Sequence, residues 1–160
     1  MRYAVSYFYQ IRFFKPYMIP FSTAIYDPQW FHKSRGNSYN FVDRNGVING
    51  LRVKYLRPSE HSEGTCHGID ECPTKNPNEC LFLQEYEHQI DNSIDSLMRY
   101  LQEYVPAIQM KLGFSEEPLV VFIVHEAPTN ACSERCKILS VMRKHGYDVD
   151  ELKYPVSQFY

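Results

Sequence analysis

Three cysteines in a turn-rich stretch are the residues whose type and spacing most clearly predict chemistry. Cys66, Cys72 and Cys80 lie in the segment 59–80, which is rich in Gly, Pro, Asn, Asp and Glu and has almost no large apolar side chains. A loop of this length needs something other than apolar burial to order it, and thiolates a few residues apart can converge on one tetrahedral ion. We therefore predict that the three cysteines bind zinc and that coordination orders the loop.

A structural zinc site needs a fourth ligand, for which the sequence offers His67, His61 and Cys132. His67 is adjacent to Cys66 and is geometrically the simplest choice, whereas Cys132 would tie the loop to a later helix. A water molecule in the fourth position would make the site catalytic. The spacing is not that of a standard zinc finger, so an iron–sulfur cluster and partly buried cysteines without a metal stay open as alternatives.

A second group of reactive side chains follows a continuous apolar run. Residues 119–124 predict a buried strand, Thr129 and Asn130 predict a helix N-cap, and residues 131–145 predict a helix that Gly146 ends. In open α/β sheets, ligands bind at the carboxyl ends of strands, where helix N-termini present unpaired N–H groups. The turn 125–135 is therefore a candidate pocket for an anion or a nucleotide.

The candidate catalytic residues in this turn are Cys132, His125 and Glu126. A helix N-terminus favours the Cys132 thiolate, and the other two side chains are suited to proton transfer. Each also has a purely structural alternative, such as a salt bridge for Glu126. The candidate ligand-binding residues are three arginines that would hold an anion: Arg12, Arg52 and Arg135. Arg12 lies in an apolar stretch, so a pairing with Glu126 is the structural alternative to ligand binding.

The remaining pattern predicts the elements that position these groups. Residues 3–14 predict a strand that is central because it is apolar on both faces, and residues 22–26 predict a second strand. Asn45-Gly46 between short apolar pairs predicts a hairpin. Apolar residues at helical spacing from Leu81 onward predict one long helix, or two helices in tandem, ending near Gly113 after a bend around Pro106. Residues 147–154 predict a last strand. We expect one domain over 1–160, an α/β fold with a small Rossmann-like three-layer arrangement and the cysteine-rich metal loop inserted before the main helix.

Composition and charge limit the classes of function. The chain has 160 residues and a net charge of −2, which argues against general adhesion to nucleic acid. The charge is uneven, since residues 1–58 carry nine Lys or Arg and two Asp, for +7, whereas residues 59–117 carry three against twelve, for −9. This asymmetry suits a phosphate-bearing ligand, or the two parts pair with each other. No apolar run of about 18 residues and no export signal is evident, so we expect a cytoplasmic protein with no membrane partner.

The turn and its flanks also carry a resemblance to a known family. A buried strand, His125-Glu126-Ala127-Pro128, then Cys132 and Arg135 at the start of a helix, and a Gly-Tyr-Asp-Val ending at residues 146–149 make up this pattern. It resembles the domain-of-unknown-function family 488, and more closely the phage and gut-bacterial relatives of that family. The stretches 7–13, 49–52 and 80–83 and the three-cysteine loop are similar to those relatives as well.

The resemblance implies a small α/β sheet domain with a site around Cys132 and Arg135, and no established reaction. The broader family tends to have Cys-His-Arg at the helix start, whereas this chain has Cys132-Ser133-Glu134-Arg135. This chain can retain the role of that histidine only if His125, on the strand side of the turn, takes its place. A phage-encoded relative would act in the host cytoplasm.

Two functions from different classes follow from the sequence. The first is an enzyme or ligand-binding domain that acts on a nucleotide, a nucleic acid or a similar anionic compound, and it predicts that the cysteine, histidine, glutamate and arginines converge on one pocket. The second is a zinc-stabilised, non-enzymatic binding module, such as a phage accessory or host-modulating protein, which predicts exposed aromatic side chains gathered in one patch.

Overall fold

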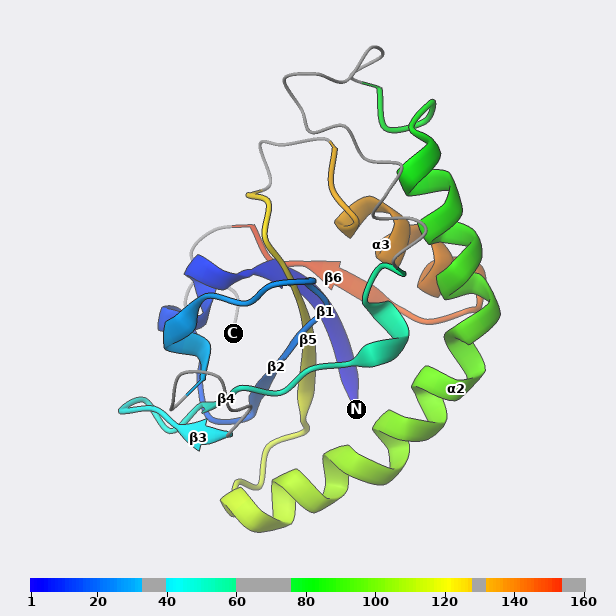
Figure 1. Cartoon of the computed structure of the whole chain (residues 1–160). Coiled ribbons are helices and arrows are strands. Elements are labelled where there is room, and N and C mark those ends of the chain that lie inside the picture. The colour runs from blue at the N-terminus through cyan, green and yellow to red at the C-terminus, as the bar shows by residue number, and fades with distance from the viewer. Residues whose placement is uncertain (33–39, 60–75, 128–131, 154–160) are drawn as a thin grey trace.

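The fold is built on a parallel β-sheet, and the helices α2 (Leu81–Leu112) and α3 (Arg135–Lys144) pack against it (Figure 1). The computed structural model describes residues 1–32, 40–59, 76–127 and 132–153. The strands and helices in chain order are β1 (Arg2–Tyr7), η1 (Phe8–Phe13), β2 (Met18–Ser22), η2 (Gln29–Phe31), β3 (Phe41–Val42), β4 (Ile48–Asn49), η3 (Lys54–Leu56), α2 (Leu81–Leu112), β5 (Leu119–Val124), α3 (Arg135–Lys144) and β6 (Val149–Glu151), where η marks a 3-10 helix.

The main sheet has four strands in the order β2-β5-β1-β6, and all three pairings are parallel. β1 lies between β5 and β6, which confirms the expected central position of the N-terminal strand and the parallel crossover. All six residues of β5 are buried, because neighbouring strands flank it and both faces of the sheet are covered. The carboxyl ends of β2, β5 and β1 therefore meet at one edge of the sheet.

The predicted N-terminal strand over 3–14 is wrong beyond Tyr7, where the chain turns into η1. In this segment Phe8, Ile11 and Phe14 are buried, at intervals of three residues, while Arg12 and Phe13 are exposed. Three residues per turn is the period of a 3-10 helix. A run of aromatic and β-branched residues has high strand propensity, and packing against the sheet overrides that propensity here.

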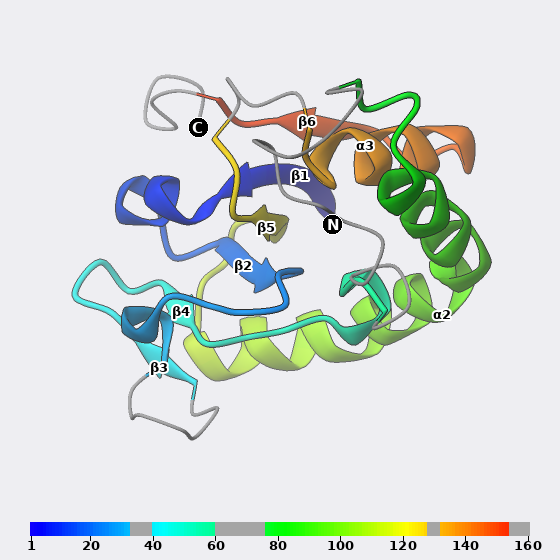
Figure 2. The ribbon, with the colours of Figure 1, turned by 45° about the horizontal axis from the view of Figure 1, so that its top comes forward.

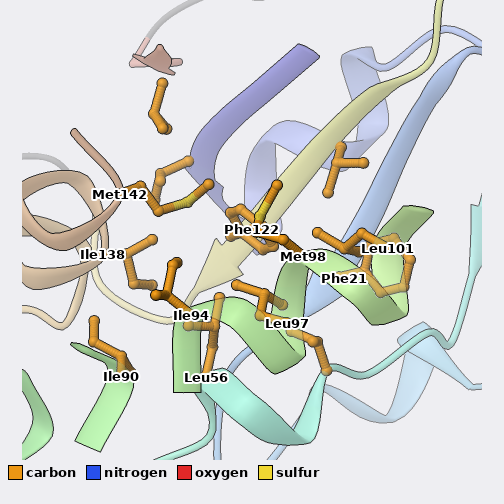
Figure 3. Packing of buried hydrophobic residues seen from close by; sticks show 14 of the residues in the cluster. Phe21, Leu56, Ile90, Ile94, Leu97, Met98, Leu101, Phe122, Ile138 and Met142 are labelled. Atoms are coloured by element: carbon orange, nitrogen blue, oxygen red, sulfur yellow. The ribbon is translucent and has the colours of Figure 1, made fainter. Parts of the chain in front are cut away.

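The two α-helices cover one face of the sheet. One buried cluster joins Val5, Phe21 and Phe122 of the strands to α2 and α3, and Figure 3 shows Phe21 and Phe122 among the side chains of the two helices. The opposite face packs against η1, Phe31 and Val47 instead of against an α-helix in the described residues. Figures 1 and 2 both show η1 on the side away from α2. The β3–β4 hairpin lies beside β2, and its Ile48 belongs to the cluster that contains α2. The mixed α/β class with a parallel sheet is therefore present, and the expected second helical layer is replaced by 3-10 turns and loops.

Two local predictions are confirmed closely. α2 ends at Leu112, and Gly113 follows with a left-handed φ of 77°, as expected for a helix C-cap. Pro106 lies inside the helix, where the sequence predicted a bend. β3 and β4 pair antiparallel around the Asn45-Gly46 turn, in which Gly46 has a φ of 79°.

None of the helices in the described part of the chain is long and apolar enough to cross a membrane.

Three predicted boundaries need correction. The second strand is Met18–Ser22 instead of 22–26, because all five of its residues are buried beside β5. The helix predicted over 131–145 begins at Arg135, since Cys132 and Ser133 belong to the preceding turn. The last strand is limited to Val149–Glu151.

Candidate functional site at the carboxyl edge of the sheet

Most of the predicted zinc ligands lie outside the described residues. This applies to Cys66, Cys72, His67 and the alternative ligand His61. Cys80 is described, and it is the residue that immediately precedes α2, with a half-buried side chain. Within residues 1–32, 40–59, 76–127 and 132–153, no group of three His, Cys, Asp or Glu side chains could hold a metal ion. The zinc site therefore stays a prediction.

Arg135 points into the protein at the start of α3. Its side chain is 9% exposed, and its Nε donates to Glu151 Oε1 at 2.8 Å. Its Nη1 donates to the carbonyls of Glu126 and Ala127 at 3.3 and 3.2 Å. The guanidinium thus joins three elements, because it ties the turn after β5 and the start of α3 to β6. These contacts give Arg135 a positioning role in the fold.

Glu126 and Glu134 form a pair of carboxyl groups beside this arginine. The Ser133 hydroxyl donates to Glu126 Oε2 at 3.0 Å. Burial, followed by repulsion from Glu126, raises the pKa of Glu134 from its usual 4.5 to about 7. The hydrogen bond between the two carboxyl groups acts in the same direction. Near neutral pH the pair therefore carries a proton that isolated glutamates would have lost.

Glu134→Gln should stabilise the protein at alkaline pH and not at acidic pH. Between pH 4.5 and about 7 the unfolded chain loses this proton while the folded chain keeps it, so the stability of the wild type falls as pH rises through that window. The expected gain is about 1–3 kcal/mol at pH 8 and none near pH 4. Urea unfolding across this range measures it, with Glu103→Gln on the exposed face of α2 as control. If the free energy of unfolding changed equally with pH in wild type and in Glu134→Gln, the raised pKa of Glu134 would be contradicted.

The two described cysteines of this region precede and open α3. Cys132 is half-buried and lies three residues before the helix begins, so it is not in the first helical turn as predicted. Cys136 Sγ donates to the carbonyl of Ser133, and burial raises the pKa of the Cys136 thiol. Tyr86 is fully buried beneath them, and burial followed by the charges of Glu134 and Glu126 raises its pKa well above 10.0. This side of the turn favours neutral side chains.

His125 faces the other side of the turn, toward β2. Its Nε2 donates to the backbone carbonyl of Tyr26, and its ring lies 5.1 Å from the ring of Phe8. Glu126, one residue later, contacts Ser133 and Arg135. The structure therefore gives the predicted proton-transfer residues His125 and Glu126 separate partners on separate sides of the turn.

The buried carboxylate of Asp27 is the centre of a polar cluster that the sequence did not predict. Its side chain is 1% exposed. Its Oδ1 accepts a hydrogen bond from the Ser22 hydroxyl, and its Oδ2 accepts from His32 Nε2 at 2.7 Å and from Arg52 Nε at 2.6 Å. Arg52 Nη2 lies 3.1 Å from His32 Nε2. One buried negative charge thus orients a guanidinium and an imidazole.

Backbone pairing at the end of β2 brings this cluster together. Ser22 is the last residue of β2, and its N–H donates to the Leu51 carbonyl while its carbonyl accepts from Val53 N–H. A bridge therefore sets Arg52 directly beside Ser22. η2 then returns the chain so that His32 faces Asp27. Of the predicted ligand-binding arginines, only Arg52 reaches this cluster.

The imidazole of His32 is held in place by this arrangement. Its Nε2 faces both the Asp27 carboxylate, which only accepts hydrogen bonds, and the Arg52 guanidinium, which only donates them. Its Nδ1 is buried and has no hydrogen-bond partner among the described residues. The side chain is 10% exposed, so most of the ring lies inside the cluster.

Arg12 is exposed on η1, and its side chain contacts Tyr9 of the same segment. Its Nε donates to the Tyr9 carbonyl at 3.1 Å, and its guanidinium lies 3.7 Å above the centre of the Tyr9 ring. The alternative pairing with Glu126 is therefore replaced by a cation–π contact. The predicted site residues are thus distributed over two sides of the turn and one neighbouring surface, while the Asp27 cluster lies at the carboxyl edge.

Comparison of the chain with protein-family models, with curated proteins and with solved structures finds no match to any of them.

Proposed function

We propose that this chain binds a phosphate-bearing ligand of the nucleotide class at the carboxyl edge of its sheet, between the ends of β2 and β5. The observation that carries the proposal is the buried Asp27 carboxylate, which fixes Arg52 and His32 side by side. The Arg52 side chain is 44% exposed, so part of its guanidinium faces solvent. Preoriented guanidinium groups bind phosphate oxygens strongly because less rotamer entropy is lost on binding.

The position of the cluster supports the same proposal. In Rossmann-like sheets, ligands bind outside the carboxyl ends of the strands. His125 directly follows β5, and Asp27 and His32 lie in the segment after β2. A hollow lined by 15–17 and 113–116 lies at the opposite, amino edge, and its described lining holds no buried carboxylate that orients a guanidinium as Asp27 does. We therefore assign the ligand to the carboxyl edge and not to that hollow.

Among the three candidate arginines, Arg52 fits the ligand best. Arg135 already donates to Glu151 and to two carbonyls. Arg12 lies over Tyr9 on the neighbouring surface. A reaction at the bound ligand would use His32 or His125 for proton transfer, and Cys132 and Glu126 stay candidate catalytic residues on the far side of the turn. The rate of turnover of the Cys132→Ser variant, compared with that of wild type, tests the catalytic role of Cys132.

Arg52→Met should weaken phosphate binding, and thermal unfolding checks that the variant is folded, because the buried Asp27 carboxylate loses one of its partners. The loss of a charge-assisted contact is worth about 1.5–3 kcal/mol, or about a 10- to 100-fold rise in Kd. Calorimetric titration with inorganic phosphate, a nucleoside and its mono- and diphosphates measures the effect and identifies the preferred class. Arg99→Met on the exposed face of α2 is the matched control. Equal affinity of wild type and Arg52→Met for every compound would refute the proposal.

A second candidate function is the zinc-stabilised binding module, a phage accessory or host-modulating protein. The exposed aromatic side chains of the described residues favour it, since Tyr9 and Phe13 contact each other on η1 and Trp30 contacts the Phe8 ring of the same segment. Protein purified without added metal should then contain about one equivalent of zinc, with three or four thiols protected from titration. Metal-free protein with five reactive thiols would remove zinc from both candidate functions and leave the Asp27 cluster untouched.

A further inference from the structure

Two exposed aromatic side chains, Tyr26 and Trp30, lie close to Asp27 and His32 in the sequence, and two more, Tyr9 and Phe13, lie on η1, whose Phe8 ring contacts Trp30; we name these four the aromatic surface. Their exposed fractions are 74%, 51%, 50% and 37% in that order. The only other exposed aromatic side chain in the described part of the chain is Tyr104 on α2. Exposed large apolar groups that gather in one place mark interaction sites more often than scattered ones do.

Ring contacts hold this surface in place. The Phe8 ring lies 6.2 Å from Trp30 in an edge-to-face contact and 5.1 Å from His125, whose Nε2 in turn donates to the Tyr26 carbonyl. Tyr9 contacts Phe13 edge-to-face at 5.9 Å. The exposed rings are therefore attached to the buried cluster of this face of the sheet, which contains Phe8. Rings fixed in this way lose little entropy when a flat ligand stacks on them.

Several basic side chains accompany the aromatic surface. Arg12 lies over the Tyr9 ring, and Arg52 is partly exposed at the Asp27 cluster. Lys15 and Arg44 are exposed nearby in sequence, and residues 1–58 as a whole carry +7. The acidic segment 59–117 supplies α2, which covers the opposite face of the sheet (Figure 2). Aromatic rings interleaved with arginines suit a ligand that has both flat bases and repeated negative charges.

We propose that the aromatic surface binds single-stranded nucleic acid, with bases stacked on its rings and phosphates against Arg12 and Arg52. This inference rests on the proposed function, because the phosphate at Arg52 is the point where the strand meets the Asp27 cluster, and it names the ligand as a polynucleotide. A duplex does not fit, since its bases are stacked on one another and their faces are covered. The modest net charge of −2 is compatible with binding because the positive charge is local.

Trp30 supplies a native reporter, since it is the only tryptophan in the chain. Titration of the full chain with an oligothymidylate of about ten nucleotides, long enough for several stacked bases, should quench its fluorescence. Thymidine monophosphate should bind at least tenfold more weakly, because it engages one phosphate and one ring. Affinity should fall steeply with added salt. A duplex of equal length should bind far more weakly than the single strand.

Single substitutions test the contribution of the aromatic rings separately from that of the phosphate contact. Tyr9→Ala and Tyr26→Ala should each weaken oligonucleotide binding about 5- to 100-fold, measured by anisotropy of a labelled strand. Tyr104→Ala, at an exposed aromatic residue of α2, should leave it unchanged. These side chains are exposed, so folding should be retained, and thermal unfolding of each variant checks that.

The outcomes distinguish this inference from the proposed function. Equal affinity for the monophosphate and the oligonucleotide, with no effect of the tyrosine variants, overturns the inference and leaves the phosphate site standing. Oligonucleotide binding that needs the tyrosines but not Arg52 supports the aromatic surface and overturns the proposed phosphate contact. No quenching by any of these ligands overturns both. If the Trp30 fluorescence is instead quenched by raising the protein concentration alone, and sedimentation shows dimers, the surface binds a second copy of the chain. That result also overturns the inference.

Discussion

Asp27→Asn is expected to lower the free energy of unfolding by about 2–4 kcal/mol. The wild-type carboxylate is 1% exposed and accepts hydrogen bonds from Ser22, His32 and Arg52. An amide at this position keeps the shape of the side chain but removes its charge. Its NH2 group also faces hydrogen-bond donors at a position where the carboxylate oxygen accepted hydrogen bonds. Arg52 and the mostly buried His32 then lose the negative charge that they share. Urea unfolding of wild type and variant measures the difference.

Asp91→Asn is the matched control for this prediction. Asp91 also binds a histidine and a basic side chain, His145 and Lys144, but its side chain is 30% exposed. Water can replace those contacts, so the control should lose much less stability than Asp27→Asn. Similar losses in the two variants would mean that burial at Asp27 is not what makes its cluster strong. A double variant with Arg52→Met should recover part of the loss, because no unpaired guanidinium remains.

Arg135→Met is expected to destabilise the protein by a similar amount, about 2–4 kcal/mol. The variant leaves Glu151 and the carbonyls of Glu126 and Ala127 without the donor that joins them. The turn after β5 would lose its attachment to β6, although the apolar part of the side chain is conserved. Thermal and urea unfolding measure the loss.

Arg143→Met separates this effect from a general loss of positive charge. Arg143 lies on the same helix and donates to the Val149 carbonyl of the same strand at 2.8 Å, but it is exposed. It should cost less than about 1 kcal/mol. If Arg135→Met were as mild as this control and instead abolished ligand binding, Arg135 would be a ligand-binding residue, as the sequence first suggested.

The elements that the sequence predicted well are those specified by their own residues. α2 has apolar residues at helical spacing over its whole length and a glycine at its end. The β3–β4 hairpin depends on Gly46, whose positive φ suits glycine. β5 is continuously apolar because it is buried on both faces. Local pattern and tertiary packing agree in these segments.

The segments that the sequence predicted poorly depend on their neighbours. Residues 8–13 have strand-like composition, yet Phe8 and Ile11 are buried by turning inward as a 3-10 helix against the sheet. α3 begins only at Arg135, because Ser133 and Arg135 are committed to contacts with Glu126 and Glu151. No local signal announces such contacts.

The candidate site was predicted only in part for the same reason. Arg52 and His125 were identified, but Asp27 and His32 were not among the predicted site residues. Their meeting depends on the bridge between Ser22 and Arg52, which are thirty positions apart in the chain. An Asp a few residues after an apolar strand, followed by a His at i+5, is the signal that could have pointed to it. Both share the carboxyl edge that the general rule for parallel sheets favours.

The most direct test of the phosphate site at the carboxyl edge is the change in backbone amide NMR shifts when the preferred nucleotide is added to the labelled chain. The account predicts that the largest changes fall on residues 22–27, 32, 52 and 125, around the Asp27 carboxylate, and that Arg52→Met removes them. Saturable changes centred instead on the amino-edge hollow of residues 15–17 and 113–116, or no changes at millimolar nucleotide, would contradict it.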